Sequence, residues 1–148
     1  MYAPTRLVLP LLLVTISLLA ASGNAGAASS GSTQPALVKV ARVGSLGRIL
    51  VTGKGFALYR WTREKTGTIR CTGQCAKVWP PLLLAKGTTA PKMVSGAAGR
   101  FGVITRPDRS RQLTHNGLAL YTYTGDTKPG EALCQGADGW YVLSASSR

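Results

Sequence analysis

Residues 48–67 read RILVTGKGFALYRWTREKTG, and residues 110–130 read SRQLTHNGLALYTYTGDTKPG. Each stretch passes from a segment of mixed apolar and polar residues, through a glycine-bearing turn, into Ala-Leu-Tyr-x-aromatic-Thr. Tyr59 and Tyr121 are 62 residues apart, and the aromatic residues two positions later keep the same spacing. Similarity at a fixed spacing indicates one supersecondary unit that is built twice and packed against its copy. The repeat therefore says more about architecture than about chemistry.

Within each copy the residue pattern has a period of two, which predicts strands rather than helices. In the first copy, residues 48–52 and 56–62 flank a glycine-rich turn at residues 53–55 and are expected to form a hairpin. In the second copy, residues 111–115 and 118–124 flank Asn-Gly, both of whose residues tolerate a positive φ. We therefore expect the same hairpin in both copies.

Further strands are expected around these hairpins. Residues 38–43 and 100–106 alternate and precede the first and second hairpin, respectively. Trp79 and Trp140 each open an apolar run, and the first run contains Pro80-Pro81, which fits a sheet edge or an extended segment rather than a central strand. The sequence predicts an all-β fold in which two tandem antiparallel β-meander repeats pack as a small sandwich or barrel-like domain.

The first 27 residues have the features of a secretory signal peptide. Arg6 supplies a positive charge, residues 7–21 are an unbroken apolar run, and Ala25-Gly26-Ala27 has the small-x-small spacing that signal peptidase accepts. The apolar run is shorter than the ~20 residues of a membrane-spanning helix. An uncleaved membrane anchor is the alternative. Because no cysteine precedes Cys71, we expect a secreted or envelope protein that is not lipid-anchored.

The rest of the chain is expected to hold one domain. Residues 28–37 begin with small and polar side chains and are predicted to be a flexible linker. Residues 38–148 have the length of one domain with a modest core and are too few for two domains. We place the repeats at about residues 38–84 and 100–143, and we expect the Gly-, Ala- and Thr-rich residues 85–99 to form a connecting loop.

The chain is strongly basic, with 18 lysine and arginine residues against five acidic residues and a formal net charge of +13. The basic residues are scattered along the sequence rather than gathered in one run. Such a charge implies attraction to anionic surfaces, and we expect an anionic cell-wall polymer or an anionic membrane surface as the partner. No specific nucleic-acid partner is predicted. The alternative is that the charge serves solubility through self-repulsion.

Four motifs together resemble a bacterial family of secreted repeats, predicted lipoproteins that share a Tyr-x-aromatic-x-x-Asp motif and have no known function. The motifs are LYRW at residues 58–61, CTGQCA at 71–76, WPPL at 79–82, and the segment from Asn116-Gly117 to Asp126. The resemblance covers about residues 43–143 and implies an envelope or extracellular β protein without implying an activity. The chain departs from the family at Glu64, where the motif has Asp, and in lacking the lipid-accepting cysteine.

The repeated motif supplies the candidate site residues Tyr59, Trp61, Glu64, Tyr121, Tyr123 and Asp126. The tyrosine and the aromatic residue two positions later share one strand face, and the acid three positions further on lies past the strand end. There it is expected to accept loop N–H groups or to cap a turn. The structural interpretation is thus a pair of core rings with loop-closing carboxylates. A carbohydrate-stacking surface and a catalytic carboxylate pair are the functional alternatives.

Cysteine spacing allows two interpretations. Cys71 and Cys75 lie four positions apart in a chain predicted to be exported, which favours a small-loop disulfide beside one helical turn at about residues 74–77. Cys134 is then free, links two chains or replaces one partner. Together with His115, whose place beside the Asn-Gly turn predicts an exposed ring, the three cysteines could instead form a closed zinc site. The disulfide is the prediction that we carry forward.

These observations predict a secreted, non-catalytic, envelope-associated binding or structural protein without a cofactor. The first alternative is a metal- or redox-handling extracellular protein that uses Cys71, Cys75, Cys134 and His115. The second is a small hydrolase that acts on wall polymers. The sequence contains no Gly-x-Ser-x-Gly nucleophile elbow, no phosphate-binding loop and no dinucleotide fingerprint to support an enzyme.

Overall fold

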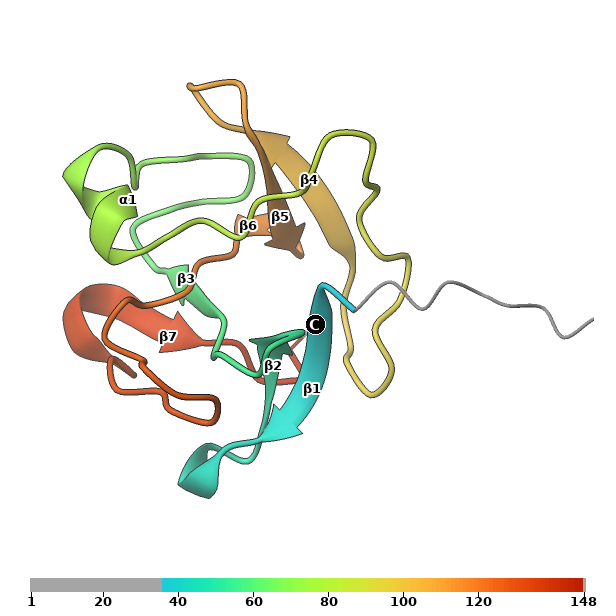
Figure 1. The fold of residues 1–148 in the computed structure, drawn as a ribbon, viewed down its shortest axis with the longest axis vertical. Helices are drawn as coiled ribbons and strands as arrows, with labels where there is room; N and C mark the ends of the chain where they lie inside the picture. Colours follow the sequence, from blue (N-terminus) through green and yellow to red (C-terminus); the bar gives the residue numbers. More distant parts are fainter. Residues whose placement is uncertain (1–35, 148) are drawn as a thin grey trace, which may run out of the picture. The chain divides into compact units, whose positions relative to one another are not determined.

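The computed structural model describes residues 36–147 (Figure 1). The predicted signal peptide, and the linker up to residue 35, lie outside the described residues. The strands are β1 (Val38–Arg42), β2 (Arg48–Thr52), β3 (Tyr59–Trp61), β4 (Phe101–Thr105), β5 (Arg111–His115), β6 (Leu118–Ala119) and β7 (Trp140–Val142). The predicted helical turn is the short helix α1 (Gln74–Val78), and single 3-10 turns, η1 and η2, lie at Gly44–Leu46 and Ala137–Gly139. No helix in this part of the chain has the length and apolarity to span a membrane.

Each repeat begins with an antiparallel strand pair followed by a returning segment. β1 pairs with β2, and Val40 lies opposite Leu50, while β4 pairs with β5, and Val103 lies opposite Leu113. Both returning segments are shorter than expected: β6 has two residues and β3 begins only at Tyr59. The expected strand at 56–62 is therefore wrong in its extent, because the returning chain leaves its own hairpin and pairs with the other repeat.

The pairing between the repeats is centred on the two matching tyrosines. The Tyr59 N–H donates to the Tyr121 carbonyl at 2.9 Å, and the Tyr121 N–H donates to the Tyr59 carbonyl at 3.0 Å. This reciprocal exchange is the pattern of a hydrogen-bonded pair in an antiparallel ladder. An approximate two-fold relation between the repeats therefore passes through this point.

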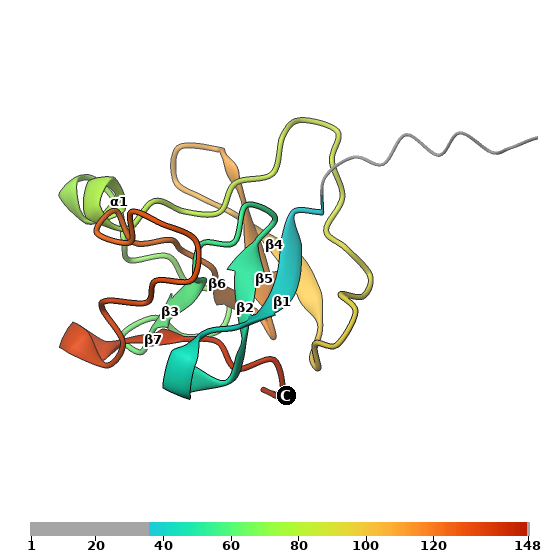
Figure 2. The same ribbon diagram turned by 60° about the horizontal axis from the view of Figure 1, so that its bottom comes forward.

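The last segment of each repeat crosses over to complete the other repeat. The Leu82 N–H donates to Leu120 at 2.9 Å and the Leu82 carbonyl accepts from Leu113 at 2.8 Å. In the same way, the Leu143 N–H donates to Leu58 at 3.1 Å and its carbonyl accepts from Leu50 at 2.8 Å. Figures 1 and 2 show the result at β7, which lies beside β3 of the first repeat, and its register places Trp140 opposite Trp61. The repeats thus exchange their Trp-led segments.

Two hydrophobic clusters lie on opposite faces of the paired strands. Alternation along the returning segment places Ala57 and Tyr59 in one cluster and Leu58 in the other, as the period of two predicts. The first cluster combines the aromatic residues Tyr59, Trp79, Tyr121 and Trp140 with smaller apolar residues. The second is aliphatic and contains Val38, Leu50, Leu58, Leu84, Val94, Leu113, Leu120 and Leu143. In the described residues these small antiparallel sheets form no closed barrel, and the predicted all-β, sandwich-like class is confirmed.

Candidate functional site

The repeated motif forms two reciprocal hydrogen bonds between the repeats. Tyr59 Oη donates to Asp126 Oδ2 at 2.8 Å, and Tyr121 Oη donates to both carboxylate oxygens of Glu64 at 2.9 and 3.0 Å. Each tyrosine therefore binds the acid of the other copy. All four side chains are buried, and both tyrosines are 0 % exposed. Hydrogen bonds from a neutral donor to a buried carboxylate are stronger than those between neutral groups.

Each of these carboxylates also closes the loop that follows its strand. Glu64 Oε1 accepts the N–H groups of Arg70 at 2.6 Å and Cys71 at 2.9 Å. Asp126 Oδ1 accepts the Leu133 N–H at 2.8 Å. The acids thus tie together a loop of their own repeat and a tyrosine of the other repeat. Both carboxylates are therefore buried and engaged by donors from the two repeats.

The phenol groups of both tyrosines are held in their protonated form. Burial, followed by the hydrogen bond to Asp126, raises the pKa of Tyr59 well above its usual range. Burial, followed by the negative charge of Glu64, raises the pKa of Tyr121 in the same direction. An ionised phenol at either place would be desolvated and would face a carboxylate, so the neutral form is favoured.

Alkaline pH is therefore expected to destabilise the domain. In the unfolded chain both tyrosines ionise near pH 10.0, whereas in the folded chain they keep their protons. Their contribution is fully present below that pH and falls above it by about 1.4 kcal/mol per pH unit for each tyrosine, because the unfolded state then binds fewer protons. Urea unfolding at about pH 9 and about pH 11 measures the slope. The double variant Tyr59→Phe/Tyr121→Phe should have a shallower slope, and equal slopes would contradict the assignment.

The second repeat contains a buried polar pair, Arg106 and Gln112, that the sequence analysis did not predict. Arg106 is 4 % exposed, and its Nη1 donates to Gln112 Oε1 while its Nη2 donates to the Cys71 carbonyl at 2.8 Å. Sixty-three residues earlier, the matching positions are Val43 and Ile49, which are apolar core residues. A residue-by-residue alignment of the copies would have revealed the exchange of an apolar pair for a polar one. The two tyrosine–acid contacts thus have different surroundings.

Four aromatic rings stack in a row across the two-fold relation. Trp79 and Trp140 stack with ring centroids 3.8 Å apart, and Trp140 continues the stack to Trp61 at 5.2 Å. At the other end, Trp79 meets Tyr123 at 4.6 Å. The two inner indoles are buried, whereas the terminal rings of Trp61 and Tyr123 are half-buried. The faces of the two inner rings therefore belong to the core. The two terminal rings leave part of their aromatic surface exposed to solvent.

The cysteines are arranged as the disulfide interpretation predicts. Cys71 and Cys75 are bonded, and Cys134 is free and half-buried. The repeat explains the odd cysteine, because Cys134 lies 63 residues after Cys71 while Asp138 occupies the position that matches Cys75. The second copy thus keeps one cysteine of the pair without its partner.

The four soft ligands of the zinc alternative are not brought together. The disulfide consumes two thiolates, and among residues 36–147 no group of three His, Cys, Asp or Glu side chains is placed to hold a metal ion. The expected exposure of His115 is wrong: the ring is 2 % exposed, its Nε2 lies 2.7 Å from the Ala98 carbonyl, and it packs on Phe101. The loop that follows residue 85 covers this side of β5, which the local Asn-Gly signal could not indicate.

Four of the five acidic side chains are buried or accept hydrogen bonds from their own loops. Glu64 and Asp126 are buried, while Asp108 and Glu131 accept hydrogen bonds from their own loops at Ser110 and Thr127. Hydrogen bonds from Ser110 lower the pKa of Asp108, and backbone N–H groups of Lys128 and Thr127 lower the pKa of Glu131. Within the described part, the single ion pair joins Arg106 and Asp108 at 4.0 Å. Surface lysines and arginines therefore carry their charge without carboxylate partners.

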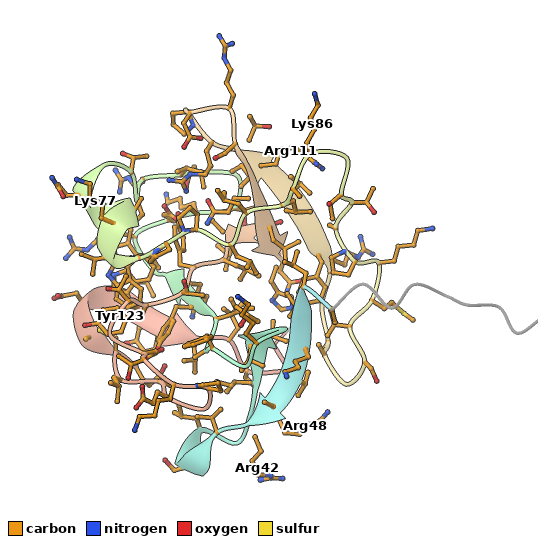
Figure 3. The ribbon with its side chains drawn as sticks, in the orientation of Figure 1. Arg42, Arg48, Lys77, Lys86, Arg111 and Tyr123 are labelled. Atoms are coloured by element: carbon orange, nitrogen blue, oxygen red, sulfur yellow. A yellow bond between two sulfur atoms is a disulfide. The ribbon has the colours of Figure 1, made fainter. Side chains whose placement is uncertain are left out.

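One pair of arginines is held in a shallow polar groove. Arg42 and Arg48 lie directly opposite each other on β1 and β2, and they line a hollow of about 530 Å³ with Ser144 and Ser146. Arg48 Nη2 donates to the Gly96 carbonyl at 3.1 Å, which fixes its side chain. Like charges directly opposite on a sheet are destabilising, and a bound anion would relieve the repulsion. Figure 3 shows both arginines at one end of the domain, away from Lys77 and Lys86.

Comparison with known proteins gives a family and no individual relative. A family model described as "Secreted repeat of unknown function", whose name classes it among lipoproteins, matches residues 40–83 and 102–144. The two matched segments contain the two copies of the tyrosine motif as far as Glu64 and Asp126. No curated protein and no solved structure matches the chain.

Proposed function

Because the chain belongs to the family of secreted repeats of unknown function, we propose that it is a non-catalytic extracellular module held on anionic polymers of the cell envelope by its basic surface. One observation carries the proposal: the whole chain has 18 basic residues against five acidic residues, and four of those acids, Glu64, Asp108, Asp126 and Glu131, are buried or accept hydrogen bonds from their own loops. A surface with so little internal neutralisation attracts polyanions over a distance set by the ionic strength.

The state of the repeated motif supports a binding role rather than a catalytic one. Glu64 and Asp126 are the acids that a hydrolase would need, and both are buried and engaged by backbone N–H groups and a tyrosine. A general base must be within reach of a proton on the substrate, and burial together with these hydrogen bonds disfavours that role for both carboxylates. The motif instead joins the two repeats and presents their basic surfaces.

The Arg42–Arg48 groove is the best-formed contact for such a polymer. Guanidinium groups bind phosphate and carboxylate through paired N–H donors, and the neighbouring serine hydroxyls supply further donors. Among the described residues, Arg48 has one side-chain hydrogen bond, to Gly96, which leaves donors for a ligand. We therefore assign phosphate- or carboxylate-bearing wall polymers as the ligand class.

Retention on purified cell wall is expected to depend steeply on salt. The Debye length falls from about 10 Å at ~0.1 M salt to about 3 Å at ~1 M, so most of the bound protein should elute over this interval. The double variant Arg42→Gln/Arg48→Gln is expected to lower the affinity about three- to tenfold, since each exposed charge contact contributes up to ~1 kcal/mol. Lys77→Gln/Lys86→Gln removes the same charge elsewhere and should have a smaller effect. Salt-independent retention would contradict the proposal, and equal losses would contradict the groove.

A further inference from the structure

Three hollows open around the point where the described chain begins. Ala36 and Leu37 line all three, which have volumes of about 550, 500 and 270 Å³. The first extends over Phe56, the second along Leu83, and the third along Met93. Figures 1 and 2 both place the yellow-green loop after residue 85 beside the first residues of β1. The three hollows therefore adjoin one another, and the surface around them is called the lysine–apolar face below.

Two large apolar side chains of this face are exposed in the part of the chain that the structure describes. Met93 is 87 % exposed, more than any other large apolar side chain in the described residues, and Leu83 is 44 % exposed. Their chain neighbours Val94 and Leu84 are buried in the aliphatic cluster, so the core is already filled at these positions. Large exposed apolar side chains beside neighbouring hollows of a secreted domain are typical of an interaction site.

The same face carries lysines and no exposed carboxylate. Each hollow is lined by one exposed lysine: Lys54 in the first, Lys92 in the second and Lys39 in the third. The one acid that lines any of these hollows is Asp126, which is buried and accepts a hydrogen bond from Tyr59. Lysine stems lie along apolar surface while their charged ends reach outward, which suits a boundary between acyl chains and phosphate groups.

We propose that this lysine–apolar face docks on an anionic lipid bilayer. Met93 and Leu83 enter the interfacial region, and Lys39, Lys54 and Lys92 contact the lipid phosphates. The charge of the face complements an anionic leaflet, and the exposed apolar side chains distinguish a bilayer from a wholly polar polymer. This docking is distinct from retention on wall polymer. Binding to the polymer requires positive charge alone, whereas binding to the bilayer requires both the lysine charges and the exposed apolar side chains.

Binding of the exported protein to lipid vesicles tests this docking. Vesicles of equal parts phosphatidylglycerol and phosphatidylcholine should bind the protein, and vesicles of phosphatidylcholine alone should bind it much more weakly. Each lysine is expected to contribute about fivefold to the partition coefficient. Leu83→Glu/Met93→Glu is expected to reduce partitioning by at least about tenfold, because it places two carboxylates in the anionic interface.

Matched controls separate the face from the overall charge. Val103→Glu/Leu133→Glu makes the same charge change at exposed apolar residues that line none of the three hollows. Urea unfolding of each variant checks that it remains folded, since all four side chains are at least 39 % exposed. Equal losses in the two double variants would overturn the proposal and leave charge as the sole attraction. No loss in Leu83→Glu/Met93→Glu would also overturn it.

The wall-retention assay distinguishes this inference from the proposed function. Leu83→Glu/Met93→Glu lowers the net charge by two, as Val103→Glu/Leu133→Glu does, so both should change wall retention equally. A selective loss of vesicle binding with equal wall retention supports the docking face. Failure of the wild type to bind phosphatidylglycerol vesicles, while it still binds wall polymer, overturns the docking face alone.

Discussion

Replacing Glu64 by alanine is expected to lower the free energy of unfolding by about 3–5 kcal/mol. The substitution leaves three buried or part-buried donors without their acceptor: the Tyr121 hydroxyl and the N–H groups of Arg70 and Cys71. It also removes the contact that joins the first repeat's loop to the second repeat's tyrosine. An unsatisfied buried donor costs about 1–3 kcal/mol, so the loss exceeds that of an ordinary surface substitution.

The repeat supplies the matched comparison for this experiment. Asp126→Ala removes two hydrogen bonds rather than four, from the Tyr59 hydroxyl and the Leu133 N–H, and should be less damaging. Asp108→Ala, at an exposed turn, should cost within about 1 kcal/mol. Urea unfolding followed by tryptophan fluorescence measures all three variants. If Glu64→Ala costs no more than Asp108→Ala, the buried carboxylate does not join the repeats in solution.

The duplicated pattern was sufficient to predict the centre of the fold. The spacing between Tyr59 and Tyr121 implied equivalent positions, and the two residues pair with each other across the two-fold relation. The turn of the second hairpin was also predicted from the Asn-Gly pair. In the structure Asn116 and Gly117 have the positive φ values, 51° and 78°, that a tight turn of this class requires. Local backbone chemistry and period-two alternation thus determine these elements directly.

The exchange of the Trp-led segments could not be predicted in the same way. Leu82 pairs with Leu113 and Leu120 of the second repeat, but the equivalent residues of its own repeat, Leu50 and Leu58, are the same residue type. Because the two sheet edges offer matching side chains, the sequence pattern favours neither pairing. The choice depends on the paths of the connecting loops, which carry little periodic signal.

The alternation of the sequence likewise could not predict which polar side chains are buried. Arg106 and His115 have the residue types of a surface, yet both are buried by segments distant in sequence. Arg106 donates to the Cys71 carbonyl as well as to Gln112, and His115 lies against the Ala98 carbonyl, so each has a partner in a loop backbone. Partners of this kind can be identified only when the positions of the loops are known.

Replacing Trp140 by alanine is expected to cost about 3–5 kcal/mol, as a large-to-small change in a packed core does. The indole stacks on Trp79 at 3.8 Å and on Trp61 at 5.2 Å, and it meets the edge of Tyr121 at 5.2 Å. The substitution therefore opens a cavity between the two repeats. Trp61→Ala, at the half-buried end of the row, should cost less, because solvent fills the vacated space.

The coupling between the two inner rings tests whether the stack itself contributes. Trp79 and Trp140 lie on the exchanged segments, so their contact joins the two crossings directly. In a double-mutant cycle, the combined Trp79→Ala/Trp140→Ala variant should lose about 0.5–1.5 kcal/mol less than the sum of the single losses. Urea unfolding of the four proteins gives the coupling energy, provided that each single variant still unfolds in one transition. Strict additivity would mean that the rings fill space independently and that the row of rings does not couple the repeats.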